Sequence, residues 1–480
     1  MIRWLSLLLI LAIVPRAEAA EGSPPVEVVI HPAEGPEPSL KYRLVPDDDS
    51  LKPGNAALFY HRGIELMDEV RRGLEPGKHD EDLVSDWLRG PSKEIPIERA
   101  KAWLDLNRNA LHEAELGARC RDCDWGLDDR PEGFGLLIPE FQPMRSFIRL
   151  VGLRARLDVI DGRPMDALRW LQTGYAMSRH VCRARFLVPL LIGVSLTSYL
   201  NRALLDVIEA PGTPSLYWVL MARPRPFIDP TGPLEGERLY LEREIPELRE
   251  LDGLPWSVAK ARAFVEDLET HFYRLSEWRP PARMGWGDEE TGRWLNRLGI
   301  AALVARSYPE ARRSLIARGR PLDQVEAMPT IQVAFLDAYL GYKVYRDDRY
   351  RWTWAPYQMA IEGLIRSEDK PVHFEGRPLL KFLCSLTSPI RPALDSTLRC
   401  GRQLDAIACI EAIRIFAAKH GRFPTRLDEI TETPAPIDPM NGHPFAYRLE
   451  GDRAILSAPE PAGYPANFGF SLRYELKLAR

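Results

Sequence analysis

The feature that most constrains this chain of 480 residues is a helical periodicity of apolar side chains, which begins near Asn55 and continues to about residue 366. Apolar residues recur three and four positions apart, the spacing of one face of an α-helix. Glycine and proline interrupt the pattern at nearly every break, as at Asp161-Gly162-Arg163-Pro164, and both residues end helices. We therefore predict a mainly α-helical domain over residues 51–390, and we expect any division into two lobes near 277–287.

Residues 146–184 are predicted to form one helical hairpin. Gly162 separates two apolar helical segments, 153–157 and 167–171. This arrangement resembles a tetratricopeptide unit, in which glycine and alanine let two antiparallel helices pack closely. No second copy is clear at a period of about 34 residues. We therefore expect an irregular multi-helix array with tetratricopeptide-like packing.

A longer stretch, from about 153 to 245, resembles a group of uncharacterised exported bacterial proteins. The resemblance rests on three segments, at 167–174 (Ala-Leu-Arg-Trp-Leu-Gln-Thr-Gly), 216–218 (Leu-Tyr-Trp) and 225–229 (Arg-Pro-Phe-Ile-Asp). It implies a helical exported fold and carries no known activity with it.

The N-terminus has the pattern of a secretion signal. Arg3 precedes the apolar run Trp4 to Val14, and Ala17 and Ala19 occupy the small-residue positions before a cleavage site. We predict a signal peptide over residues 1–19 and a periplasmic or extracellular protein. An uncleaved anchor is the alternative, but a membrane span needs roughly 20 apolar residues. The Pro- and Glu-rich residues 20–50 are predicted to be a flexible lead-in.

Two further patterns limit the partners of the mature chain. The apolar stretch Phe186 to Leu200 contains proline, serine and threonine, so we predict a buried helix and no stable membrane span after signal removal. The formal net charge is −4, and arginines are interleaved with acids throughout the chain. A mildly acidic chain is poorly suited to neutralising phosphates, so we expect no nucleic-acid partner.

The segment from near Ser396 to the C-terminus has its own motif. A helix ends at Gly421-Arg422-Phe423-Pro424, and Asp438-Pro-Met-Asn-Gly-His-Pro-Phe-Ala-Tyr447 precedes two short alternating runs. Gly421 is predicted to cap the helix in a left-handed conformation, and Asn441-Gly442 to form a turn. This order resembles the periplasmic domain of a type II secretion major pseudopilin. The resemblance implies a small α+β domain over residues 391–480, without the apolar assembly helix, the prepilin peptidase site or the calcium loop of that family.

The cysteines offer one close pair, Cys120 and Cys123. The pair follows a helix and has acidic neighbours, which disfavour the reactive thiolate. Because exported proteins meet an oxidising compartment, we predict a structural disulfide between these two residues. Cys400 and Cys409 are predicted to lie on one helix, about 13 Å apart along its axis, and therefore not to be bonded.

Other candidate sites have weaker patterns. The acidic loop 122–129 does not follow the ligand order of an EF-hand, so we expect a solvated loop and no metal site. A dense aromatic cluster lies between 339 and 357. Tyr339, Tyr342 and Tyr345 have helical spacing and are assigned to the core. The candidate ligand-contacting residues are Tyr350, Trp352, Trp354 and Tyr357, with carbohydrate as the candidate ligand.

No catalytic or cofactor motif is found in the sequence, so we predict no cofactor and assign no catalytic residue. The leading hypothesis is an exported, non-enzymatic helical scaffold or binding protein of the cell envelope, whose partner is a protein or an envelope polymer. The alternative is a hydrolase that acts on an envelope polymer through carboxylates brought together by the fold. A pocket that gathers two or more acids against an aromatic wall would favour the hydrolase.

Overall fold

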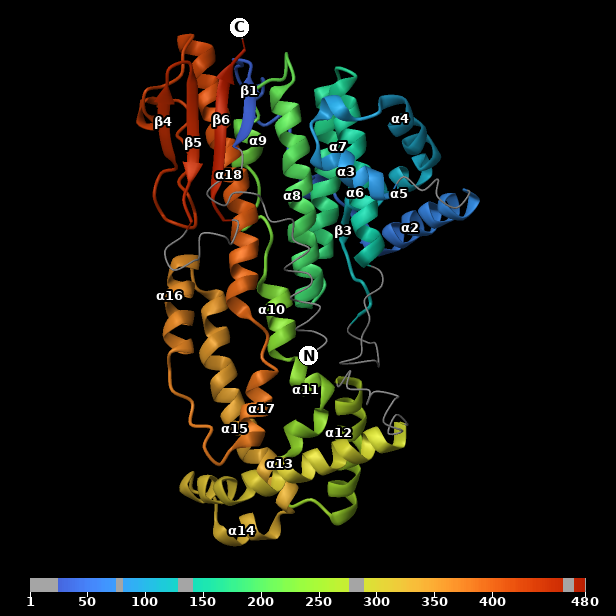
Figure 1. Cartoon of the computed structure of the whole chain (residues 1–480), viewed down its shortest axis with the longest axis vertical. Coiled ribbons are helices and arrows are strands. Elements are labelled where there is room, and N and C mark those ends of the chain that lie inside the picture. Colours follow the sequence, from blue (N-terminus) through green and yellow to red (C-terminus); the bar gives the residue numbers. More distant parts are fainter. Residues whose placement is uncertain (1–24, 75–80, 128–140, 276–288, 461–469, 480) are drawn as a thin grey trace. The chain divides into compact units, whose positions relative to one another are not determined.

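The computed structural model describes residues 25–74, 81–127, 141–275, 289–460 and 470–479. Helices predominate, and a small sheet lies near the C-terminus, as the sequence predicts (Figure 1). The predicted signal peptide, residues 1–19, lies outside the described residues.

The chain forms two compact units. The first, here called the inserted unit, comprises residues 233–392. The second, here called the main unit, contains the described residues before 233 and after 392. This division differs from the predicted one. The helical region 51–390 is shared between the units, and the C-terminal segment folds with the N-terminal helices instead of alone.

The main unit contains the helices that precede residue 222 in the described part of the chain. They are α2 (Ala56–Gly73), α3 (Glu81–Arg89), α4 (Ile97–Leu106), α5 (Arg108–Ala118), α6 (Phe141–Ile160), α7 (Pro164–Val181), α8 (Leu187–Glu209) and α9 (Tyr217–Met221). The predicted hairpin is confirmed as α6 and α7, which pack against each other. Gly162 in their connection has a φ of 75°, a left-handed conformation that glycine adopts without steric cost.

Helix α8 is the buried helix predicted from its apolar sequence. Among the described residues it alone is long and apolar enough to cross a membrane. Within the main unit, however, 78% of its most apolar window is buried. That burial is the pattern of a core helix, because a core supplies the apolar contacts that lipid would otherwise provide.

Two sheets belong to the main unit. Strands β2 (Lys52–Asn55) and β3 (Cys120–Asp122) pair in parallel. The larger sheet has the order β1-β6-β5-β4 and contains β1 (Val26–Ile30), β4 (Ala446–Glu450), β5 (Arg453–Ala458) and β6 (Leu472–Leu478). Strand β1 pairs in parallel with β6, and the other neighbours are antiparallel.

Strand β1 corrects one prediction. Residues 20–50 were expected to be a flexible lead-in, yet Val26–Ile30 forms one side of the C-terminal sheet (Figure 1). Val28 and Ile30 are fully buried, and the Val29 amide donates a hydrogen bond to the Glu209 carboxylate at 2.8 Å. Alternating apolar residues within a Pro- and Glu-rich stretch are therefore enough to add an edge strand when a buried surface accepts them.

Helix α18 (Ile390–His420) begins in the inserted unit and continues into the main unit. Within the main unit it is buried along much of its length, and Ile407, Cys409 and Ile413 are fully covered. Cys400 and Cys409 both lie on this helix with free thiols, which confirms that they are not bonded to each other.

The inserted unit is entirely helical in its described part. Its elements are most of α10 (Thr231–Arg238), then α11 (Tyr240–Glu244), α12 (Val258–Leu275), α13 (Glu289–Ala317), α14 (Leu322–Ala327), α15 (Thr330–Tyr350), α16 (Tyr357–Glu368) and α17 (Pro378–Ser385). Its core forms around α15, whose Val333, Phe335 and Leu336 are fully buried. Pro309 lies inside α13, so that helix runs past a residue that usually ends one.

Candidate binding site

A groove lies at one end of the C-terminal sheet in the main unit and is here called the sheet-end groove. Its volume is about 800 Å³. It lies where the loop after α18, the β4–β5 turn and the end of β6 come together. Its lining comprises Val29, Gly421, Arg422, Phe423, Thr425, Leu449, Gly451, Asp452, Arg453, Lys477, Leu478 and Ala479.

Two glycine turns shape this groove. Gly421 has a φ of 67°, and its amide donates to the Ala417 carbonyl at 2.9 Å, which confirms the predicted cap at the end of α18. Pro424 then prevents the helix from resuming. Gly451, with a φ of 64°, makes the tight turn between β4 and β5. Backbone groups of both turns therefore face the same hollow.

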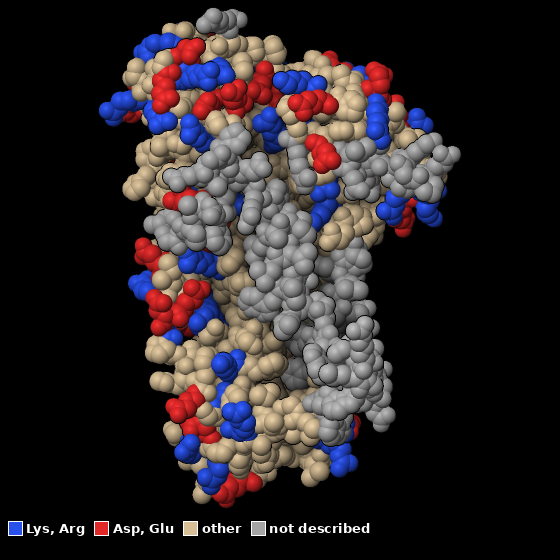
Figure 2. Space-filling model, in the orientation of Figure 1, with Lys and Arg blue, Asp and Glu red and all other residues tan. Residues whose placement is uncertain are grey.

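Basic side chains outnumber acidic ones in the lining. Arg422, Arg453 and Lys477 contribute positive charge against the single carboxylate of Asp452. Each cation has an acidic neighbour outside the lining: Glu429 lies 3.3 Å from Arg422, Glu475 lies 3.6 Å from Arg453, and Glu27 lies 3.1 Å from Lys477. Figure 2 shows side chains of both charge signs around the C-terminal sheet.

The acidic partner of Arg422 is held by more than one contact. The Thr425 hydroxyl and amide both donate hydrogen bonds to the Glu429 carboxylate. These bonds, together with Arg422, lower the pKa of Glu429. The loop that forms one side of the groove is therefore ordered by its own polar contacts.

A buried ion pair anchors the predicted Asp-Pro turn to α18. Arg402 is fully buried, and its guanidinium group contacts both carboxylate oxygens of Asp438 at 2.8 and 2.5 Å. The same carboxylate accepts bonds from the Met440 amide and the Asn441 side chain. Arg402 also donates to the carbonyl of Phe470, two residues before the start of β6. The motif that carries the pseudopilin resemblance thus ties α18 to the sheet.

A second buried pair on α18 fixes β1 and the segment before α9. The Glu411 carboxylate accepts the Ser215 hydroxyl at 2.6 Å and the Leu216 amide at 2.7 Å. Arg414, three residues further along the helix, donates to the carbonyls of His31 and Thr213. Every one of these contacts is internal, so both side chains serve the fold and face no ligand.

The predicted disulfide between Cys120 and Cys123 is wrong. All six cysteines are free. Residues 120–122 are an extended strand, and three residues at about 3.3 Å each span about 10 Å, whereas a disulfide needs Cα atoms within about 7 Å. The Cys120 thiol instead donates to the Leu116 carbonyl, and burial raises the pKa of both thiols. Of the acidic loop, the structure describes residues 122–127.

The predicted ligand-contacting aromatics belong to the inserted unit and differ in exposure. Tyr350 is buried. Trp352 donates to the Ser367 hydroxyl at 3.0 Å, and its ring lies over Gly363 on α16. Tyr357 is half-buried, whereas Trp354 is 58% exposed. Trp354 is therefore the one member of this set that presents most of its side chain to solvent.

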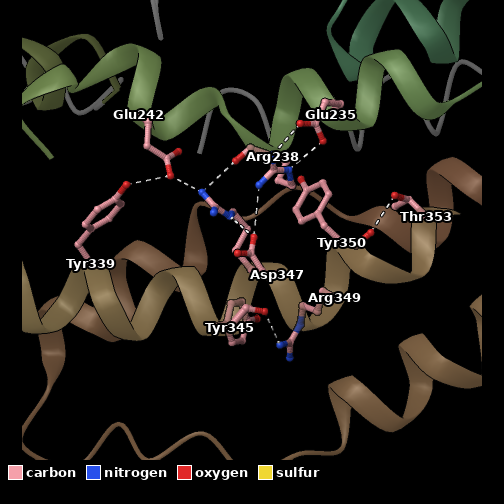
Figure 3. A network of polar contacts seen from close by, with 10 residues as sticks. Glu235, Arg238, Glu242, Tyr339, Tyr345, Asp347, Arg349, Tyr350 and Thr353 are labelled. Carbon is pink, nitrogen blue, oxygen red and sulfur yellow. Dashed lines mark hydrogen bonds and ion pairs between the residues drawn. The ribbon is translucent and has the colours of Figure 1, made fainter. Parts of the chain in front are cut away.

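Tyr339, one of the three tyrosines assigned to the core, takes part in a polar network (Figure 3). Tyr339 and Tyr342 are buried, and Tyr345 is partly buried. The Tyr339 hydroxyl donates to the Glu242 carboxylate at 3.1 Å, and Arg346 binds the same oxygen. Burial and Glu242 raise the pKa of Tyr339 to about 12. Because Glu242 is held by a cation and by a hydrogen-bond donor, this group links α11 to α15 in the interior.

Neither cavity described meets the criterion set for a hydrolase. The sheet-end groove contains one carboxylate, Asp452. A second cavity, of about 250 Å³, lies between α2 and the start of α6 and also contains one, Asp68. Asp68 already pairs with Arg71 at 2.7 Å. Among the described residues, no group of three or more histidine, cysteine or acidic side chains is placed to hold a metal ion.

Comparisons of the chain with protein-family models, with curated proteins and with solved structures find no match. The pseudopilin resemblance of residues 391–480 therefore stays a prediction from its motifs. No motif in the sequence indicates the sheet-end groove, because its lining comes from separate parts of the chain that meet only in the fold.

Proposed function

We propose that this chain is an exported, non-enzymatic binding protein of the cell envelope, and that the sheet-end groove holds an acidic segment of a protein or an envelope polymer. The observation that carries the proposal is the lining itself: three cations and one carboxylate around a hollow of about 800 Å³. That volume lies within the range of about 300–1,000 Å³ that is typical of ligand-binding pockets.

The charges in the groove support an anionic ligand. Arg422 is 56% exposed, and its partner Glu429 is 29% exposed. Ion pairs at such exposure contribute about 0–1 kcal/mol, so a ligand carboxylate can replace Glu429 at little cost. The ligand also meets backbone groups at the two glycine turns, which suits an extended segment better than a compact molecule.

The assignment to the envelope comes from the predicted signal peptide, residues 1–19. The proposal that the chain binds without catalysis rests on the groove. Its single carboxylate cannot provide both the acid and the base that glycoside hydrolysis uses. Trp354 is a second exposed group in the inserted unit for a carbohydrate ligand to contact.

The test uses a fluorescent hexaglutamate peptide as a defined probe for an acidic segment. We expect the mature wild-type chain to bind it, as measured by fluorescence anisotropy at low ionic strength. The double variant Arg422→Glu/Lys477→Glu is expected to lose at least tenfold in affinity. The control Arg426→Glu/Arg473→Glu makes the same change in net charge at two exposed arginines outside the lining.

Two outcomes would overturn the proposal. Equal binding by the groove variant and its control would show that the groove does not hold the acidic segment. Degradation of an envelope polymer by the purified chain, abolished by one carboxylate substitution, would instead establish the hydrolase.

A further inference from the structure

Among the residues that the structure describes, strand β4 has one edge without a strand partner. The sheet order is β1-β6-β5-β4, so β4 lies at one end of the sheet. Four of its five residues are exposed, and Tyr447 is half-buried. An edge strand with free backbone groups is a template for pairing with another extended chain.

The turn geometry identifies the free backbone groups of β4. Glu450 and Arg453 close a two-residue turn and therefore exchange hydrogen bonds with each other. Because bonded and non-bonded positions alternate in an antiparallel pair, the N–H and C=O groups of Tyr447 and Leu449 point away from β5. Neither of these two amides donates to any described residue.

The side chains of β4 differ between the two faces of the sheet. Leu449 lies opposite Ala454, which is fully buried, yet Leu449 is itself 38% exposed at the end of that row. Arg448 and Glu450 lie together on the other face, with their charged groups 2.8 Å apart. The edge thus presents one apolar side chain between two opposite charges.

We propose that β4 pairs antiparallel with β4 of a second copy of this chain, about a two-fold axis at Leu449. In this register the two Leu449 amides and carbonyls bond to each other, and the two Leu449 side chains meet. Arg448 of each copy then faces Glu450 of the other. Opposite charges directly across an antiparallel pair stabilise it.

The charge pattern distinguishes the register with its axis at Leu449 from the register shifted by one residue. A two-fold axis at Arg448 would also use the free groups of Tyr447 and Leu449. It would, however, place the two Arg448 guanidinium groups directly opposite each other, and like charges in that position destabilise a pair. The self-complementary pattern of Arg448, Leu449 and Glu450 therefore favours the axis at Leu449, and a second copy as the occupant.

The edge is short, so the pairing is expected to be weak and concentration-dependent. A standard stable interface buries about 1,200–2,000 Å², more than a five-residue strand provides. Leu449 also lines the sheet-end groove, but the inference does not require the acidic ligand, and its test leaves Arg422, Lys477 and Leu449 unchanged.

The experiment is sedimentation equilibrium of the mature chain over a wide concentration range. We expect the wild type to form dimers at high concentration. Arg448→Glu and Glu450→Arg, each alone, should weaken association at least tenfold, because each places like charges opposite one another. The double variant Arg448→Glu/Glu450→Arg restores the complementary pattern and should restore the dimer.

Arg426→Glu serves as the matched control, since Arg426 is 77% exposed and lies outside the strand. Circular dichroism verifies that every variant folds. A wild type that stays monomeric up to several hundred micromolar would overturn the proposal, as would a double variant that fails to recover. A dimer indifferent to all three edge variants would show that copies meet through another surface.

Discussion

The buried pair of Arg402 and Asp438 gives the sharpest prediction for stability. Asp438 is 2% exposed, and Arg402 is fully buried. Asp438→Asn keeps the size of the side chain but removes the charge, and it places an NH₂ donor where Arg402 needs an acceptor. Removing one partner of a buried ion pair costs about 3–5 kcal/mol, because the other charge is left buried without compensation.

The matched control for this change is Asp428→Asn, in the same segment of the chain. Asp428 also pairs with an arginine, at 2.7 Å, but is 65% exposed, so its pair contributes about 0–1 kcal/mol. Urea unfolding followed by tryptophan fluorescence and circular dichroism compares the two variants. An Asp438→Asn variant within 1 kcal/mol of Asp428→Asn would refute the argument that this pair anchors the Asp-Pro turn.

Four further predictions concern His180, two helix glycines and the cysteines. Burial, helped by two nearby arginines, lowers the pKa of His180 to about 3. The pKa of histidine in the unfolded chain is about 6.5, so the unfolded chain takes up a proton at a higher pH than the folded chain does. The free energy of unfolding is therefore highest above pH 6.5 and falls as the pH drops towards 3, by about 2 kcal/mol between pH 7 and 5. Unfolding of the wild type and of His180→Gln at both pH values should show a smaller pH dependence in the variant. Gly193→Ala should destabilise by about 1–3 kcal/mol, since its Cβ would lie 2.2 Å from the Cys182 sulfur. The added Cβ of Gly401→Ala meets no atom within 4 Å, so this variant should be stabilised by about 0.5–1 kcal/mol; thermal melts compare both glycine variants with the wild type. All six cysteines should react with a thiol reagent after denaturation without reductant. A titre of four thiols would show instead that two cysteines form a disulfide.

Local pattern predicted the helices best. The hairpin of α6 and α7 and the glycine cap at Gly421 were found from spacing and turn chemistry, because both depend on residues close in sequence. Boundaries were less accurate where a helix is interrupted. Helices α4 and α5 follow each other directly and are divided at Asn107, whose side chain donates a hydrogen bond to the Trp103 carbonyl.

The local sequence pattern does not predict contacts between residues that are far apart in the chain. Strand β1 is stabilised by β6, which lies at the other end of the sequence. Because this partner cannot be seen in the local sequence, the Pro- and Glu-rich composition of residues 20–50 led to the prediction of a flexible segment. Leu58, an apolar residue of α2, is 63% exposed. Arginine is mostly exposed in proteins, so the sequence alone gives no reason to expect Arg402 to be buried. Its contacts with Asp438 and with the Phe470 carbonyl explain its complete burial.

The candidate site was missed for the same reason. The groove combines Val29, a loop after α18, a hairpin turn and the end of β6. None of these segments carries a recognisable binding motif by itself. The cysteine pair, by contrast, has a recognisable motif, but the extended backbone of β3 keeps the two thiols apart.

The proposed function depends on whether the sheet-end groove holds the partner. Its most direct test is photo-crosslinking in envelope extract, with the crosslinking amino acid placed at the exposed groove residue Thr425 and, as a control, at the exposed Asp105 of α4. We predict a specific adduct from Thr425 that disappears when Arg422→Glu/Lys477→Glu is added, and no such adduct from Asp105. Identical adducts from both positions, or an adduct from Thr425 that survives the two charge reversals, would contradict the account.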